Sequence, residues 1–503
     1  MVRRFSGPFF LTKTFIRLLF IPVLLPLLAA CVAVGPDYHK PSVRLPVAWN
    51  SKAGIQTPHL AEWWKRLDDP VLDQLIADGI AGSPDIATAK AKVRQMRANL
   101  MLEGGNLYPT VNGDGSFTRS DIGSAGVSNQ SDFGFKTQWE LDLFGGNRRG
   151  VEAAYYAAES TSEQLRGALV TLIGDIATHY AQLRGVQAAI AIAEHNAASQ
   201  RRTVTLTRTQ LQAGNIAQLD LLNAETQAAS TEAGIPALHI NYARYLNGLS
   251  VLTGRSAATL AGMLDKVRPL PTVPRAVSAG LPADLLLNRP DIRAAERDYA
   301  RATAQIGQKQ AALYPALSLT GNINTGGANF GDLARLSTIG WSFGPSLNIP
   351  IFRGGKLRAD VDIAKASRDQ SFIAYRKAIL TGLSEVENAS VALNQNRLRV
   401  AKLRRVVDNN RRINALTLDQ FSAGTKSFLD VLTAQRNLLS EETNLAQAHT
   451  DLVVNYVALQ KALGGGWNGQ IDVGRTEIED GYTGPHLVKP AVRPAAQKAT
   501  EPL

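Results

Sequence analysis

Apolar and polar side chains alternate along four segments of this chain, as they do along a β-strand with one apolar face. In residues 133–143 the apolar side chains take odd positions, namely Phe133, Phe135, Trp139, Leu141 and Leu143. Residues 339–351 repeat this pattern, and two partner segments alternate more weakly. Because successive side chains of a strand point to opposite faces, the period of two predicts strands. They pair as two hairpins, with strands at about residues 111–119, 132–144, 316–325 and 338–351.

Two much longer stretches, residues 148–212 and 356–422, are compatible with continuous α-helix. Both are rich in Ala, Leu, Gln, Glu and Arg, and neither contains proline. At 1.5 Å per residue, a helix of roughly 65 residues spans nearly 100 Å, far more than a globular domain uses. Shorter predicted helices flank them, at about residues 85–107, 218–252, 291–313 and 427–463.

The hairpins and helices form an internal duplication, with the second copy about 206 to 210 positions after the first. The copies are residues 83–264 and residues 289–466. Their matching motifs include Ser83-Pro84-Asp85-Ile86 with Arg289-Pro290-Asp291-Ile292, and Leu219-Asp220-Leu221-Leu222 with Leu429-Asp430-Val431-Leu432. A repeated plan of this kind indicates one architecture rather than several separate domains.

The first thirty residues have the pattern of a targeting segment. Four basic residues precede or flank an apolar stretch at residues 18–28, which is shorter than the roughly 20 residues of a spanning helix. It ends in Leu28-Ala29-Ala30-Cys31, which resembles the bacterial lipobox and holds the only cysteine. We therefore expect a lipoprotein signal peptide at residues 1–30 and acyl chains on Cys31. Residue 32 is Val, whereas Asp at this position commonly retains lipoproteins at the inner membrane, so we expect the outer membrane. The alternative is an ordinary signal peptide that ends in a free cysteine.

An outer-membrane anchor changes what the alternating strands predict. A soluble sheet with one buried face gives the same alternation, but segments of about ten such residues are also typical of transmembrane β-barrels. Four strands cannot close a barrel, and an open sheet edge leaves backbone groups unpaired in lipid. A homotrimer that supplies roughly 12 strands is the smallest symmetric assembly with an open bore.

Composition excludes several other classes of function. The formal net charge of +11 is spread along the chain without interleaved aromatics, so we expect no nucleic-acid partner. The seven histidines are scattered, and we expect neither catalysis nor a cofactor other than the lipid on Cys31. No metal site is expected, because Met96, Met101 and Met263 form no cluster, which favours organic cargo over copper or silver.

Several motifs resemble those of TolC-like outer-membrane factors, in the NodT-type branch of efflux lipoproteins. They are Val34-Gly35-Pro36-Asp37-Tyr38, Trp63-Trp64, Asp69-Pro70, Trp139-Glu140-Leu141-Asp142-Leu143-Phe144-Gly145, Gly280-Leu281-Pro282-Ala283-Asp284-Leu285-Leu286 and Arg289-Pro290-Asp291-Ile292-Arg293-Ala294-Ala295-Glu296. The resemblance covers nearly everything from residue 28 to residue 466. It implies a mostly α fold with a four-stranded membrane contribution, in which a trimeric 12-stranded β-barrel continues into a long periplasmic α-helical barrel. Residues 31–82, the linker 265–288 and the tail 467–503 would supply an equatorial region, part of the tail being mobile.

The same resemblance implies a passive exit duct in the outer membrane. A periplasmic adaptor and an inner-membrane pump, expected to be of the resistance-nodulation-division (RND) class, would dock on it to export drugs or toxic organics. Docking would involve the turns between long and short helices, where the candidates are Gly214, Asn215, Gly424, Thr425 and Lys426.

A periplasmic gate is expected just past each turn, at Leu219, Asp220, Leu222, Leu429, Asp430, Leu432 and Thr433. Leucines three apart share a helix face and could form an apolar ring. Relatives often carry Asp where this chain has Thr433, so that carboxylate ring is absent, and Asp430 or Asp220 could replace it. Two alternatives stay open: a duct for type I protein secretion, and a structural lipoprotein that spans the periplasm without a pore.

Overall fold

The computed structural model describes residues 33–42, 60–121, 123–274, 283–467 and 471–478. The predicted signal peptide, Cys31 and most of the predicted C-terminal tail lie outside the described residues. The chain divides into two compact units. The first unit contains Met1–Ser42, Gln95–Thr161 and Ala294–Arg376, and the second contains Val43–Arg94, Ser162–Arg293 and Lys377–Leu503.

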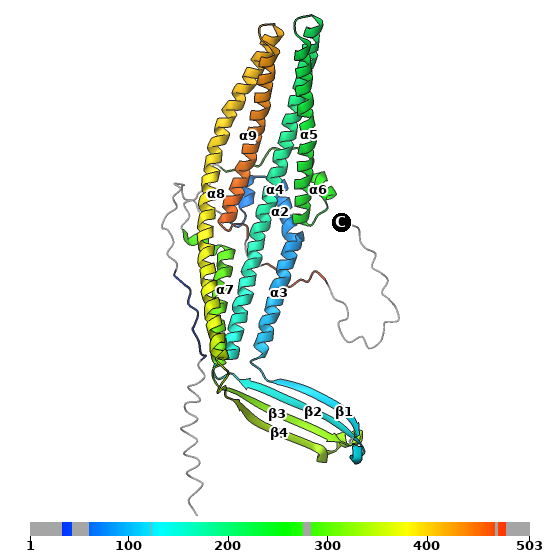
Figure 1. Cartoon of the computed structure of the whole chain (residues 1–503), viewed down its shortest axis with the longest axis vertical. Helices are drawn as coiled ribbons and strands as arrows, with labels where there is room; N and C mark the ends of the chain where they lie inside the picture. The colour runs from blue at the N-terminus through cyan, green and yellow to red at the C-terminus, as the bar shows by residue number, and fades with distance from the viewer. Residues whose placement is uncertain (1–32, 43–59, 122, 275–282, 468–470, 479–503) are drawn as a thin grey trace, which may run out of the picture. The chain divides into compact units, whose positions relative to one another are not determined.

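The first unit contains one antiparallel sheet with the order β1-β2-β3-β4 (Figure 1). The strands are β1 (Thr110–Asp121), β2 (Val127–Leu141), β3 (Ala316–Gly327) and β4 (Ile339–Asn348). Short 3-10 helices, η2 (Gly123–Ala125), η4 (Phe330–Ala334) and η5 (Leu336–Thr338), lie in the hairpin connections. β2 begins about five residues earlier than the pattern predicted, and β4 ends earlier. Pro350 has no backbone N–H to donate, which accounts for the early end of β4.

The apolar face of this sheet is exposed, since no other described part of the chain covers it. Phe135 and Phe343 are 51% and 67% exposed, and Trp341 is 77% exposed. The outer edges of β1 and β4 have no partner strand in the described sheet. A lone sheet with these properties is incomplete, because both its apolar face and its edges lack a neighbour.

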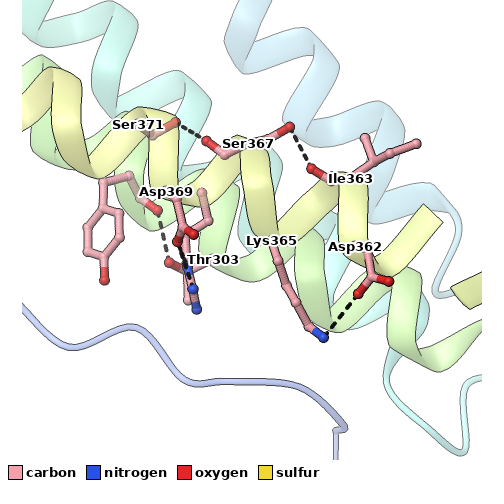
Figure 2. A network of polar contacts seen from close by, with 9 residues as sticks. Thr303, Asp362, Ile363, Lys365, Ser367, Asp369 and Ser371 are labelled. Atoms are coloured by element: carbon pink, nitrogen blue, oxygen red, sulfur yellow. Dashed lines mark hydrogen bonds and ion pairs between the residues drawn. The ribbon is translucent and has the colours of Figure 1, made fainter. Parts of the chain in front are cut away.

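Helices adjoin the sheet within the first unit: the end of α3 (Pro84–Gly105), the start of α4 (Gly146–Gln212), most of α7 (Pro290–Ala311) and the start of α8 (Lys356–Ser422). Figure 2 shows how hydroxyl groups on α8 are satisfied within the helix. Ser371 Oγ donates to the carbonyl of Ser367, and Ser367 Oγ donates to the carbonyl of Ile363. On neighbouring α7, Thr303 makes the same bond to its own preceding turn. Such bonds let short polar side chains occupy a helix interior.

The second unit is a bundle built around two antiparallel helical pairs, α4 with α5 (Gln218–Thr253) and α8 with α9 (Phe428–Ala462) (Figure 1). The remaining elements are η1 (Trp63–Leu67), α2 (Pro70–Gly82), α6 (Ala257–Leu264) and η3 (Ala283–Asn288). Arg201 pairs with Glu232 at 2.5 Å, and Arg411 pairs with Glu442 at 2.8 Å. These two ion pairs lie at equivalent positions of the two copies, so the duplication extends to tertiary contacts.

The two long helices match the sequence expectation closely, since α8 covers residues 356–422 and α4 begins two residues before residue 148. Among the helices that the structure describes, none combines the length and the apolar character needed to cross a membrane.

Candidate functional site

The two turns between the long and short helices have the same backbone geometry. Gly214 and Gly424 adopt positive φ angles of 76° and 72°. The N–H of Gly214 donates to the carbonyl of Leu211 at 2.9 Å, and the next N–H reaches back to Gln210 at 3.0 Å. The bonds at Gly424 follow the same pattern, at 3.0 and 2.9 Å. This pair of hydrogen bonds is a Schellman motif, whose left-handed position favours glycine.

All five docking candidates lie exposed on these turns, as a binding surface would require. They are Gly214, Asn215, Gly424, Thr425 and Lys426. Asn215 donates to the Gln210 side chain at 2.7 Å, and the Thr425 hydroxyl donates to the Gln420 carbonyl at 2.9 Å. Side-chain bonds therefore fix the shape of each turn. That these residues contact another protein stays a prediction.

Beneath the turns lies an apolar cluster shared by all four helices of the two pairs. Its buried members are Ala224, Phe421, Phe428, Val431 and Leu432, and Val204, Leu206, Ile216 and Leu418 pack against them. The rings of Phe421 and Phe428 meet edge to face at 5.9 Å. The cluster therefore joins the two turns into one end of the bundle.

This cluster includes one of the gate candidates. Leu432 is 6% exposed and belongs to the buried cluster, so its side chain packs inside the single chain. Leu429, Leu219 and Leu222 are 67%, 66% and 51% exposed. Leu429 and Leu432 are three residues apart, but the helix turns far enough between them to bury one and expose the other. The two copies thus differ here, since Leu222 is the exposed counterpart of Leu432.

Asp430 has a structural partner that the sequence analysis missed. Its Oδ2 accepts from the backbone N–H of Ser427 at 3.1 Å and from the Ser427 hydroxyl at 2.7 Å, and Ser427 in turn accepts from the Asp430 N–H. These hydrogen bonds hold the pKa of Asp430 below its usual value. The signal was present as Ser-x-x-Asp before an apolar run, the pattern of a capping box.

The remaining gate candidates have simpler environments. Thr433 is exposed and its hydroxyl donates to the carbonyl of Leu429 at 2.8 Å. Asp220 is half-buried at the first turn of α5, where Ala217 offers no side-chain cap. Within the described part of the chain, no group of three histidine, cysteine or acidic residues is placed to hold a metal ion.

The segment that follows the predicted lipobox is held against the helices of the first unit. The guanidinium of Arg149 donates to the carbonyls of Val34 and Gly35 and to Asp37, at 3.2, 3.3 and 2.7 Å. The Tyr38 hydroxyl donates to Glu296. A Cβ at Gly35 would lie 2.3 Å from the Cα of Gly307. The motif Val34-Gly35-Pro36-Asp37-Tyr38 can therefore pack against α7 only if positions 35 and 307 are both glycine.

Comparisons with known proteins agree with this geometry. The family model described as outer membrane efflux protein matches residues 75–255 and 281–465. The chain is 34% identical over 457 residues to nodulation protein T of Rhizobium leguminosarum bv. trifolii, covering 88% of this chain and 96% of that protein. It is 32% identical over 467 residues to the toluene efflux pump outer membrane protein TtgI of Pseudomonas putida, covering 89% and 98%.

Solved structures of outer-membrane channels are also similar to this chain over most of its length. The outer-membrane channel OprN matches with a TM-score of 0.79 and 33% identity, over 86% of this chain and 99% of that chain. The open state of the MtrE outer membrane channel of Neisseria gonorrhoeae matches with a TM-score of 0.75 and 27% identity, over 86% and 98%.

Proposed function

This chain belongs to the outer membrane efflux protein family, and from that premise we propose how its described residues build an exit duct. Members of this family are channels rather than enzymes. The chain is the outer-membrane channel of a tripartite efflux pump, and it extends from the outer membrane into the periplasm. An adaptor and an inner-membrane pump are its partners, and we assign the pump to the RND class.

The duct is a homotrimer, and the incomplete sheet is the observation that carries this proposal. Three copies would pair β4 of one chain with β1 of the next and close twelve strands. An exposed apolar stripe on α8 supports a helical neighbour as well, because its members recur at intervals of 7, 8 and 11 residues: Leu380, Val391, Leu398, Val406 and Ile413. The twelve-stranded barrel would then continue into a barrel of helices.

Acyl chains on Cys31 anchor the duct to the inner leaflet of the outer membrane. The lipobox-like run Leu28-Ala29-Ala30-Cys31 supports this assignment, and the contacts of Arg149 with Val34, Gly35 and Asp37 would hold the chain close to such an anchor. Several acyl chains bind a bilayer stably, at about 0.8 kcal/mol per buried methylene.

The exposed leucines just past the turns form the closed gate, and the turns themselves dock the adaptor. Leu429, with Leu219 and Leu222, would give threefold apolar rings that exclude water from a narrow pore. Asp430 is engaged in its capping box, so Asp220 is the better candidate for a cation-binding position. Thr433 contributes no charge.

The cargo is a set of small toxic organic molecules. The relatives named for toluene and solvent efflux pumps support this class. Selectivity would lie mostly in the pump, since a polar duct binds its cargo weakly.

A photo-crosslinking residue at Lys426 tests this function in living cells. Mass spectrometry should recover a periplasmic adaptor, and the same residue placed at Lys365 on the early part of α8 should not recover it. Cells in which the gene is deleted should be more sensitive to organic solvents, and expression of the intact protein should restore their tolerance. Recovery of only cell-wall fragments or unrelated lipoproteins at Lys426, with no change in tolerance, would favour a structural tether instead.

A further inference from the structure

A groove in the second unit has no role in the duct described above. It lies between α4, α8 and α9 and is bordered by linker residues 269–273, with a volume of about 700 Å³. Pro271, Val400, Leu445 and Val453 provide an apolar lining. We call it the linker groove. Its volume lies within the range of about 300 to 1,000 Å³ that is usual for ligand sites.

The charged side chains of the linker groove are unequally paired. Arg411 pairs with Glu442, which also accepts from Asn196 at 2.9 Å. Arg397 donates to the carbonyl of Pro274 at 2.6 Å, which holds the linker in place. Arg404, which is exposed, has no ion pair among the described residues. The groove therefore presents cationic groups in excess over its single carboxylate.

His449 adds a polar but uncharged group beside Arg404. It is half-buried, and burial together with the charge of Arg404 lowers its pKa. At neutral pH the ring is therefore neutral and can donate one hydrogen bond without adding a charge.

The internal duplication shows that this charge is particular to one copy. The pair Arg411–Glu442 has its counterpart in Arg201–Glu232, at an offset of 210 residues. At the same offset, however, Arg404 corresponds to Glu194. The stretch of α8 around the groove carries the basic residues Arg397, Arg399, Lys402, Arg404, Arg405, Arg411 and Arg412, whereas the equivalent stretch of α4 has only Arg201 and Arg202. The excess of basic residues around the linker groove is therefore a feature of the second copy.

We propose that the linker groove binds a short acidic peptide, the chemistry of the peptidoglycan stem peptide. A carboxylate of the peptide would bind the Arg404 guanidinium, and His449 would donate to a second oxygen. The small side chains of Ala188, Ala401 and Ala446 leave room for the peptide backbone on the apolar lining. Because this unit belongs to a protein that extends into the periplasm, it lies in the compartment that contains the cell wall.

The test measures binding of a fluorescent muropeptide, containing the stem L-Ala-D-Glu-diaminopimelate, to the full-length protein in detergent. Arg404→Glu should weaken binding at least tenfold. Glu occupies the equivalent position of the other copy, so the fold should tolerate it; Arg404→Gln provides a second variant, and gel filtration checks assembly of both. The matched control is Arg412→Gln, an exposed cation on α8 that does not line the groove, and it should bind as the wild type does.

Three results would overturn the proposal. They are absence of binding to the wild type, equal binding by Arg404→Glu, and equal losses in Arg404→Glu and Arg412→Gln, which would indicate diffuse charge. Binding of poly-glutamate as tight as that of the muropeptide would overturn the cell-wall assignment. The assay involves no transport, so failure of the efflux function would leave its outcome unchanged, and Arg404→Glu cells should keep solvent tolerance.

Discussion

At the scale of single residues, the two turns offer a natural comparison of helix caps. Ser427 and Asp430 form a capping box on α9, whereas Ala217 begins α5 without one, although Asp220 follows it at the same spacing. Ser427→Ala should destabilise the tip of α9 by about 1 kcal/mol. Ala217→Ser should complete the box with Asp220 and slow exchange at the start of α5. Hydrogen exchange of the first-turn amides measures both; equal exchange in all variants would mean that these caps do not limit fraying.

His449 provides a titration at the same scale. Its pKa lies below its ordinary value of 6.5, so the unfolded chain binds the proton at a higher pH than the folded protein does. The free energy of unfolding should therefore fall as the pH drops through about 6.5 toward the folded pKa, and level off below it. NMR titration of the His449 ring checks the shift. Arg404→Gln should raise this pKa part of the way, since burial remains; a pKa at or above 6.5 in the wild type would contradict the assignment.

At the scale of the elements, the start of α9 separates a packing leucine from an exposed one. Leu432→Ala should lower the free energy of unfolding by about 2 to 5 kcal/mol, because it leaves a cavity in the apolar cluster beneath the turns. Leu429→Ser should leave thermal stability nearly unchanged but increase conductance in planar bilayers, because it removes an apolar ring. If Leu429→Ser destabilises the protein and leaves conductance unchanged, Leu429 is a packing residue and not part of the gate.

For these helices and strands, some features could be predicted from the sequence and others could not. The limits of α8 followed from the absence of proline over a long helical composition, and the four strands followed from alternation. The sequence did not predict that Leu432 is buried while Leu429 is exposed. This difference depends on packing against Phe421 and the paired helices α4 and α5, which come together only in the folded chain. The capping role of Asp430 could be predicted from Ser427 three residues before it, whereas the duplicated Leu-Asp motif favoured a position in a pore.

At the scale of the whole molecule, the sheet decides whether the chain needs lipid and further copies. On β4, Phe343 and Ser342 point to opposite faces of the same strand. If three chains close a barrel with the apolar face toward lipid, Phe343→Lys places a charge in hydrocarbon at a cost of about 2 to 4 kcal/mol near the midplane. Ser342→Lys places the same charge toward a water-filled bore and should assemble normally.

The measurement is the amount of trimer in purified outer membranes, resolved by native mass spectrometry. Loss of trimer with Phe343→Lys and retention with Ser342→Lys requires a lipid-facing apolar surface. If the sheet were soluble and buried this face against protein, Phe343→Lys would also prevent assembly. In that case, however, the wild-type protein would be absent from the membrane fraction as well. The reverse sensitivity, with Ser342→Lys disruptive and Phe343→Lys tolerated, would place the apolar face inward and exclude an aqueous duct through this sheet.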